Sequence, residues 1–305
     1  MGIVNSDGLS LVGARAEFME KYEATQALWP DVTTTIKSTA ESESYRWLGS
    51  VPPVRNWDGG RQIRGMFTQR YDVLNEKFEI TIAADRDAIS DDKVGAIRLR
   101  IGDMAERAKL FGDSEVARLL INGHSAGFNS YDGVPFFSTT HSSGLSGTQS
   151  NAIVSDVTTP TNPSAADVRT ALNAAIPALL ALKDDQGEPM NLTASGLVFV
   201  IPPTMYIAFL EAVNSAVIAS TTNILQNVGR VVAFPRLTAT TIFYVLKVDT
   251  QVRGLIYQDR EPIEFKQLAE GSEEEFMREQ YIFGVRFRGK FTYGYWQKAI
   301  KVTLT

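Results

Sequence analysis

Apolar and polar side chains alternate along the last stretch of the chain. The odd-numbered positions include Val285, Phe287, Phe291, Tyr293 and Tyr295. The even-numbered positions include Arg286, Arg288, Lys290, Thr292 and Gly294. A period of two predicts a β-strand with one apolar face and one polar face. We expect the aromatic face to pack in a core. The three cations could contact phosphates or a neighbouring subunit's acidic groups, or form an ordinary solvated face.

Three other stretches carry apolar residues at alternating spacings of three and four. This spacing predicts amphipathic helices over residues 8–29, 90–122 and 163–183. Pro30 would end the first helix, Ser90 would cap the second, and Gly123 would follow its last turn. At about 1.5 Å per residue the second helix would be a rod about 45 Å long.

The first predicted helix has a narrow apolar stripe. The stripe consists of Leu11, Ala14, Phe18, Tyr22, Thr25 and Trp29. A polar run over residues 33–43 separates this helix from the rest of the chain. We therefore expect the helix to lie apart from the main body and to bury its stripe on its own domain or on a neighbouring subunit.

Residues 45–85 have the composition of extended chain. Pro52, Pro53 and the glycines at 59, 60 and 65 would break a helix, whereas apolar residues at 78, 80 and 82 alternate as in a strand. The segment is poor in continuous apolar runs. We therefore expect a projecting β arm, with Asp58, Gly59 and Gly60 forming a turn near its tip.

The rest of the chain divides into loop and compact regions. Residues 127–162 are rich in Gly, Ser, Thr and Asn and predict a loop. Residues 195–250 predict a compact α/β unit with strands over 197–201, 228–234 and 241–248, a helix through residues 205–213, and a loop over 215–227. The chain then returns in strands over 252–268 and 275–304.

Composition excludes several classes of protein. A chain of 305 residues with 44% apolar residues can bury one large core or two modest ones. A net charge of −5 argues against a dedicated duplex-DNA binder. The chain has no cysteine, so disulfides and thiolate metal sites are excluded. The N-terminal residues do not resemble a signal peptide, and we expect no transmembrane helix.

One pattern resembles a catalytic motif. Gly123, Ser125 and Gly127 match the Gly-x-Ser-x-Gly nucleophile elbow of serine esterases. That motif requires a strand before the serine and a helix after it, whereas here a predicted helix precedes the serine and a loop comes after it. The only downstream histidine is His141, in a Ser/Gly-rich loop. A helix end and a turn therefore explain the pattern better.

The remaining ionisable groups fit no familiar site. His124 and His141, with Asp113 and Asp132, match no usual metal-ligand spacing, and we expect both histidines to be exposed. The carboxylate pairs at 91–92 and 184–185 are expected to cap helices or lie in solvated loops, and residues 273–275 to form a solvated turn. No glycine-rich nucleotide-binding pattern occurs. We expect no catalytic site, cofactor or metal.

Several short sequences together resemble a known family. They are WLG at 47–49, WDGGR at 57–61, FEIT at 78–81, DD at 91–92, YDGVPFF at 131–137 with His141, QDRE at 258–261, YIFGV at 281–285 and GYW at 294–296. In this order they resemble the major head subunit of Mu-like bacteriophages, within the Hong Kong 97-like capsid fold. No single one of these sequences is specific, and none carries a catalytic role.

The resemblance implies an α+β fold divided into four parts. Residues 1–44 would form the N-arm and residues 45–85 the E-loop, an extended β arm. Residues 86–194 and 250–305 would form the peripheral P-domain, with its spine helix at about 90–122. Residues 195–249 would form the axial A-domain. Trp57, Asp58, Gly59 and Gly60 are the expected assembly residues at the E-loop tip.

The function implied by the resemblance is that of a structural protein. Copies would assemble as hexamers and pentamers into the icosahedral head shell of a tailed phage or prophage, enclosing double-stranded DNA through non-specific contacts. The expected partners are a separate scaffolding protein, since only about ninety residues precede the spine helix, a portal protein and a decoration protein, with no membrane. The protein would assemble in the host cytoplasm and reside in the virion. An encapsulin-like compartment and the serine esterase remain alternatives.

Overall fold

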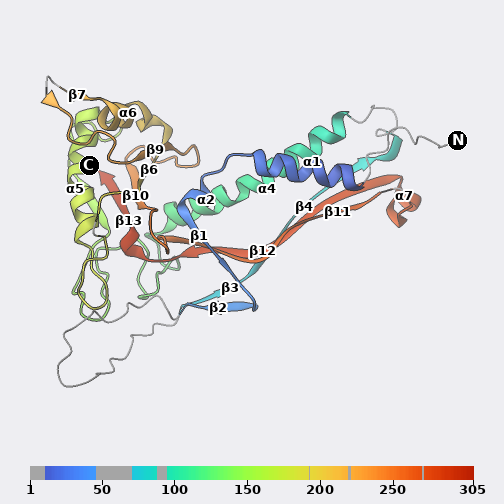
Figure 1. The fold of residues 1–305 in the computed structure, drawn as a ribbon, viewed down its shortest axis with the longest axis horizontal. Coiled ribbons are helices and arrows are strands. Elements are labelled where there is room, and N and C mark those ends of the chain that lie inside the picture. The colour runs from blue at the N-terminus through green and yellow to red at the C-terminus, as the bar shows by residue number, and fades with distance from the viewer. Residues whose placement is uncertain (1–10, 46–70, 88–94, 192, 219–220, 270) are drawn as a thin grey trace, which may run out of the picture.

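The computed structural model describes residues 11–45, 71–87, 95–191, 193–218, 221–269 and 271–305, and it is elongated (Figure 1). A long four-stranded sheet occupies one end, with the strand order β1-β11-β12-β4. A five-stranded sheet with the order β5-β13-β10-β6-β9 occupies the other end. The secondary structure mixes helices and strands, which confirms the predicted α+β fold class.

The four-stranded sheet is built around two long strands. Its members are β1 (Thr33–Lys37), β11 (Leu255–Leu268), β12 (Gln280–Tyr293) and β4 (Glu76–Asp85). β1 pairs with β11 in parallel, and the other neighbours are antiparallel. Along β12, Val285, Phe287, Phe291 and Tyr293 are buried. The period-two prediction for this stretch is therefore confirmed.

Two helices cover one face of this sheet: α1 (Leu11–Ala24) and α4 (Gly95–Asn122). α4 has 28 residues, which corresponds to a rod about 42 Å long. Its predicted stripe is buried at Ile97, Ile101, Met104 and Ala108. The capping residue expected at 90, with the carboxylates at 91–92, lies outside the described residues.

The first helix differs from its prediction in length and in placement. It ends at Ala24, and a separate short helix, α2 (Trp29–Val32), begins five residues further on with Pro30 in its first turn. Ala14 and Phe18 are fully buried on the same chain, and the Phe18 ring lies 5.3 Å from that of Phe265. Of the two surfaces expected to bury the stripe, the chain's own does so, because α4 and the sheet cover Ala14 and Phe18. The expectation that the helix lies apart from the main body is wrong.

Trp29 locks α2 against α4. Its indole Nε1 donates a hydrogen bond to the carbonyl oxygen of Lys109 at 3.1 Å, and a Cβ at Gly112 would collide with its ring. Asp113 accepts the backbone N–H groups of Leu28 and Trp29 at 2.9 and 2.8 Å. Burial raises the pKa of Asp113, and these two hydrogen bonds only partly offset the effect.

The polar run after α2 is not a simple tether. Residues 33–37 form β1, which pairs with β11 from Thr33 opposite Leu255 to Lys37 opposite Asp259. The short strand β2 (Ser42–Ser44) comes next and pairs with β3 (Asp72–Leu74). The pattern at 78, 80 and 82 is confirmed as a strand, but β4 lies in the sheet beside β12 along its length and does not project.

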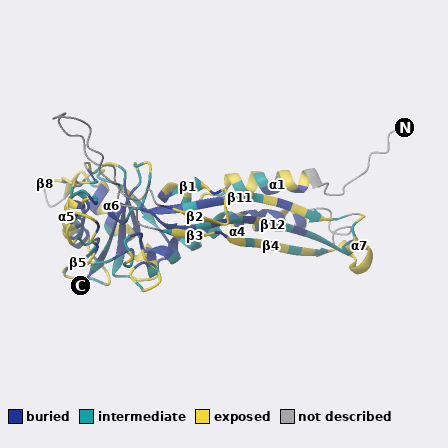
Figure 2. Ribbon diagram, turned by 90° about the horizontal axis from the view of Figure 1, so that it is seen from below, coloured by how far each residue is buried: buried dark blue, intermediate teal, exposed yellow. Residues whose placement is uncertain are grey.

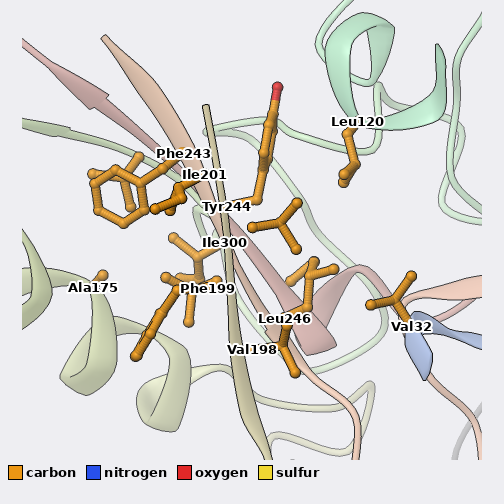
Figure 3. Close-up of a cluster of buried hydrophobic side chains, with 14 of the residues drawn as sticks. Val32, Leu120, Ala175, Val198, Phe199, Ile201, Phe243, Tyr244, Leu246 and Ile300 are labelled. Atoms are coloured by element: carbon orange, nitrogen blue, oxygen red, sulfur yellow. The ribbon is translucent and has the colours of Figure 1, made fainter. Parts of the chain in front are cut away.

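The other end of the molecule is built on the five-stranded sheet. Its strands are β5 (Ala152–Ser155), β13 (Ala299–Leu304), β10 (Ile242–Lys247), β6 (Leu197–Ile201) and β9 (Arg230–Ala233). Helices α5 (Ala165–Ala181) and α6 (Tyr206–Asn214) pack on it. Phe199, Phe243 and Ile300 meet in this core (Figure 3). Fully burying such side chains contributes roughly 1.5–3 kcal/mol each.

Helix α5 lies within its predicted range of 163–183 and is two residues shorter at each end. Ser164 accepts the N–H of Asp167, and the Asp167 carboxylate accepts the N–H of Ser164, which completes a capping box. Val168, Leu172, Ile176 and Leu179 form its buried stripe.

Six local elements were not expected. β5 lies within the predicted loop 127–162, and β7 (Val217–Ile218) with β8 (Thr221–Thr222) forms a small hairpin within the predicted loop 215–227. Helix α7 (Glu273–Arg278) replaces the predicted solvated turn, with Ser272 as its N-cap. Short 3₁₀ turns, η2 (Pro203–Met205) and η3 (Trp296–Lys298), precede α6 and β13.

The two ends of the molecule have separate hydrophobic cores that share β12. Val285 and Phe287 belong to the core beneath α1 and α4, which we call the long-sheet core. Phe291 and Tyr293 belong to the core of the five-stranded end. Figure 2 shows buried residues gathered at the five-stranded end and continuing as a band along the long strands. The relative position of the two ends is therefore fixed by continuous strands.

Candidate assembly surface

The segment proposed from the sequence as an arm has a firmly anchored base. Gln258 on β11 is fully buried, and its amide oxygen accepts a 2.6 Å hydrogen bond from the Tyr45 hydroxyl. Its amide nitrogen donates to Asn75 Oδ1 at 2.7 Å. Burial raises the pKa of Tyr45. Since β2 and β3 are also paired and the Tyr45 N–H donates to the Tyr71 carbonyl oxygen at 2.9 Å, the two residues that flank the undescribed segment lie side by side.

The expected tip of that arm cannot be placed. Trp57, Asp58, Gly59 and Gly60 lie outside the described residues. The same holds for the sequences at 47–49 and 91–92 that contribute to the family resemblance.

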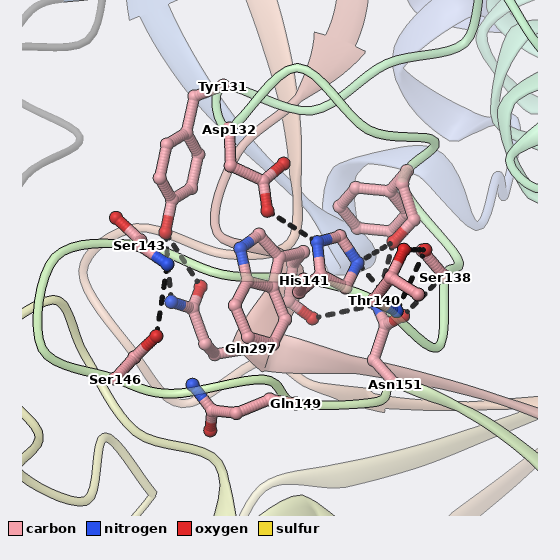
Figure 4. Close-up of polar contacts among 12 residues, drawn as sticks. Tyr131, Asp132, Ser138, Thr140, His141, Ser143, Ser146, Gln149, Asn151 and Gln297 are labelled. Carbon is pink, nitrogen blue, oxygen red and sulfur yellow. Dashed lines mark hydrogen bonds and ion pairs between the residues drawn. The ribbon is translucent and has the colours of Figure 1, made fainter.

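Two other parts of the resemblance meet in a buried cluster around His141 (Figure 4). The His141 side chain is fully buried, with Nδ1 2.6 Å from Asp132 Oδ2 and Nε2 3.2 Å from both Asn151 Oδ1 and the Phe136 carbonyl oxygen. Its ring stacks on that of Trp296, with centroids 4.0 Å apart. The expectation that His141 is exposed is therefore wrong. No local pattern signals this burial, because Trp296 comes from the other end of the chain.

The cluster fastens the loop after α4 to the last strand. Asn151 Nδ2 donates hydrogen bonds to the carbonyl oxygens of Phe136, at 2.7 Å, and of Trp296, at 3.2 Å. Gln297 exchanges hydrogen bonds with the Tyr131 hydroxyl. The sequences at 131–137 and 294–296 thus act together to position a loop.

The metal-ligand candidates are dispersed. His124 is exposed, as expected, and Asp113 caps α2 far from the His141 cluster. Within the described residues no three His, Asp or Glu side chains gather as a metal site would require. Asp184 Oδ1 accepts the N–H groups of Gln186 and Glu188 at 2.9 Å and so shapes a turn, whereas Asp185 is buried and not solvated.

The esterase-like motif lacks the required context. Ser125 lies in a turn directly after α4, where its N–H donates to the Asn122 carbonyl oxygen at 2.8 Å. Gly123 has no left-handed backbone conformation. A Cβ at this position would instead meet the Leu119 carbonyl oxygen and the Phe137 ring. Close packing at the helix end explains this glycine, and His141 uses its ring nitrogens elsewhere.

The cations of β12 have partners on the same chain. Arg288 and Arg286 contact the Glu261 carboxylate at 2.7 and 2.9 Å, and Lys290 pairs with Glu76. The Arg288 hydrogen bond is the main cause of the lowered pKa of Glu261. These cations therefore hold neighbouring strands of the same chain together.

Large exposed apolar side chains mark other regions of the surface. They include Phe276 and Met277 on α7, Ile207 on α6, and Val217 and Ile224 near the β7–β8 hairpin. Single exposed apolar residues are common, but adjacent ones indicate interaction surfaces. None of the helices in the described part of the chain is both long and apolar enough to cross a bilayer.

A long helix on an extended sheet, continuous with a compact five-stranded end, defines a Hong Kong 97-like capsid fold. Solved structures that share it include the procapsid of bacteriophage JBD30 (23% identity, TM-score 0.56, covering 96% of this chain and 74% of that one), the JBD30 capsid decorated with minor capsid protein trimers (17%, 0.52, 90% and 63%) and the capsid of cyanophage P-SCSP1u (13%, 0.60, 100% and 93%).

Sequence comparison defines the family within this fold. The family model for the Mu-like prophage major head subunit gpT matches residues 9–168 and 236–305. The FluMu major head subunit of Haemophilus influenzae is 22% identical over 94% of this chain and 70% of its own length. The major capsid protein of Escherichia phage Mu is 29% identical over 42% of this chain and 41% of its own length. The chain belongs to the Mu-like prophage major head subunit gpT family.

Proposed function

We propose that this head subunit assembles with copies of itself, as hexamers and pentamers, into a closed icosahedral shell around double-stranded DNA. The observation that carries the proposal is the family match, which extends over both the long sheet and the last strands. The elongated body with exposed apolar side chains at its extremities supports it. Closed assemblies bury the same surface patches repeatedly by symmetry, and many weak contacts then add to a durable shell.

Electron microscopy of the purified protein tests this function. The protein is expressed alone and together with a scaffolding protein from the same phage or prophage, and the particles are imaged. We expect closed shells of uniform diameter. A monodisperse monomer at high concentration under both conditions would contradict the proposal.

The division into parts is also proposed. Residues 1–44 would serve as the N-arm, 45–85 as the E-loop, 86–194 and 250–305 as the P-domain, and 195–249 as the A-domain. The α1–α4 layer on the long sheet supports a peripheral part, and the β6–α6–β9–β10 region supports an axial part. The proposed division passes through one sheet, since β13 pairs with β10 of the proposed A-domain on one side and with β5 of the proposed P-domain on the other.

The E-loop assignment rests on the anchored base at Gln258 and on the paired strands β2 and β3. A segment of about 25 residues that starts and ends at this base can reach a neighbouring subunit, since extended chain spans roughly 3.3 Å per residue. Trp57, Asp58, Gly59 and Gly60 are the proposed contact residues at its tip.

The other partners belong to the same proposal. A separate scaffolding protein, a portal protein and non-specific contact with the packaged DNA are expected from the role of a head subunit, with assembly in the host cytoplasm and residence in the virion. A decoration protein is supported by the decorated capsid among the related structures. The family is one of head subunits, so an enzyme compartment has no observation in its favour.

A structural role without catalysis completes the proposal. The turn geometry at Ser125 and the complete use of the His141 ring nitrogens argue against an esterase. No observation favours a second catalytic function.

A further inference from the structure

Helix α7 displays two apolar side chains at the far tip of the long sheet. Phe276 is 87% exposed and Met277 is 69% exposed. Figures 1 and 2 show this helix at the end of the β11–β12 hairpin, remote from the five-stranded end. We call the α7 residues with Glu279 the tip plug.

The opposite side of α7 holds the helix in place. Glu275 is buried and accepts the N–H of Gly271 at 2.5 Å, and Arg86 Nε lies 3.5 Å from its carboxylate. Ser272 caps the first turn, and Glu279 takes a left-handed conformation, with φ of 52°, after the last. A left-handed residue other than glycine costs free energy. The chain therefore fixes a helix whose outward side is apolar, which indicates that this side contacts something.

The tip plug is acidic around its apolar residues. The tip plug has three outward carboxylates, on Glu273, Glu274 and Glu279, and one cation, Arg278. The Arg278 guanidinium already pairs with Glu274 at 3.0 Å. A surface that receives the plug should therefore combine an apolar floor with a cationic rim.

A groove of that kind lies between β4 and α4, in the middle of the long sheet. Its volume is about 670 Å³, and its floor includes Phe78, Leu110 and Phe111. Lys77, Arg107 and Arg236 line its edge and are exposed, together with one carboxylate, Glu79, which accepts a 2.6 Å hydrogen bond from Thr81. This volume is within the roughly 300–1,000 Å³ of ordinary binding pockets. We call it the spine groove.

The plug and the groove of one molecule cannot meet. The plug is at the end of the β11–β12 hairpin, and the groove lies further back on the same sheet, where β4 pairs with β12. A contact between them must join two molecules.

We propose that the tip plug of one subunit docks in the spine groove of a second copy of this chain. Phe276 and Met277 lie on the apolar floor, and the plug carboxylates face Lys77, Arg107 and Arg236. The contact is heterologous, so it closes into a ring or continues through the assembly. The inference rests on the proposed assembly into shells and specifies one surface that the shell uses.

Cysteine crosslinking tests the contact directly, because the natural chain contains no cysteine. A chain with Met277→Cys and Lys77→Cys is assembled and treated with a short bismaleimide. We expect a ladder of covalent oligomers that neither single variant gives. The matched control pairs Met277→Cys with Val154→Cys, since Val154 is equally exposed, at 67%, on the other end of the molecule. Wild-type-like shells without the ladder would overturn the inference.

Charge reversal gives an independent test. Lys77→Glu with Arg107→Glu should abolish closed particles, and adding Glu273→Lys with Glu279→Lys should restore them. Phe276→Ser should also abolish particles, whereas Phe276→Leu should retain them. The isolated variants should melt like the wild type, because these side chains are exposed.

The outcomes distinguish a failure of the proposed shell assembly from a failure of the proposed docking contact. Failure of the wild type to form any particle would refute shell assembly, and the docking contact with it. Normal shells from the reversed-rim variant, or no restoration by the reversed plug, would refute the docking contact alone.

Discussion

The Nδ1 atom of His141 lies 2.6 Å from the Asp132 carboxylate, and both side chains are fully buried. This pair is the centre of the cluster that fastens the loop after α4 to Trp296. Breaking a buried pair by removing one partner leaves an uncompensated group in the interior. The cluster should therefore contribute strongly to the stability of the five-stranded end.

We expect His141→Ala to lower the free energy of unfolding by about 3 kcal/mol, because Asp132 loses its partner and Trp296 loses the stacked ring. Chemical denaturation of the unassembled subunit measures this change. His124→Ala is the matched control, since His124 is exposed, and it should stay within about 0.5 kcal/mol of the wild type. Equal effects of the two substitutions would show that the cluster is not stabilising.

Two helical glycines on α4 should respond oppositely to alanine. A Cβ at Gly112 would collide with Trp29, and overpacking costs about 1–3 kcal/mol. A Cβ at Gly102 would lie 3.8 Å from Lys21 Cγ, an ordinary contact, so Gly102→Ala should stabilise the protein by about 0.5–1 kcal/mol. Thermal melting of both variants provides the comparison. A stabilising Gly112→Ala would contradict the close packing of Trp29.

The capping box of α5 should make stability depend on pH in acid. Burial alone would raise the pKa of Asp167, but hydrogen bonds from Ser164, Thr159 and Thr158 lower it to about 2. Its unfolded value is about 3.9. The carboxylate therefore contributes stability that is fully present above about pH 4 and is lost as the pH falls toward 2.

Asp167→Asn should remove this dependence. We expect the variant to lose about 1 kcal/mol at neutral pH, because the cap weakens, and to lose less than the wild type between pH 4 and 2. Denaturation midpoints across this range measure the difference. Parallel pH profiles for the two proteins would contradict the assignment.

The arm should be needed for assembly but not for folding of the subunit. Residues 50–70 are replaced by a short Gly/Ser linker, which leaves the hydrogen bond between Tyr45 and Gln258 in place. We expect a soluble subunit that melts cooperatively and forms no closed shells by electron microscopy. An insoluble product would show that the segment belongs to the core, and normal shells would show that it is dispensable.

Ser125 should be inert. Ser125→Ala should leave assembly unchanged, and a fluorophosphonate probe should not label Ser125 in the wild type, because the turn after α4 has no strand before it. Mass spectrometry of probe-treated protein gives the result. A covalent adduct on Ser125 would revive the esterase hypothesis.

The sequence predicts best where the signal is local. Helix α5 has its cap at Ser164 and a complete stripe, and β12 alternates over most of its length, so both could be located from spacing alone. The order of short sequences also led to the correct family and fold, because that order reflects the whole architecture.

Partners that are distant in sequence explain the errors. The threonines of β1 favour extended backbone, but they stand in a polar run without an alternating apolar pattern. They form a strand because β11, more than 200 residues later, offers an edge. His141 sits in a polar loop with no apolar neighbours that would indicate burial, and Trp296 encloses it. The exposed tip of α7 was missed because a run of three glutamates gives the pattern of a turn.

The continuity of β11 and β12 has a mechanical consequence. The two strands run unbroken from the long-sheet core into the five-stranded end, so a change in the angle between the two ends must bend both strands. The irregularities in pairing near Asp259, Glu261 and Glu264 lie within this strand pair. Bulges bend and twist a strand. We therefore expect a change in the curvature of the subunit to arise at this point, where a small local adjustment is magnified by the length of the sheet.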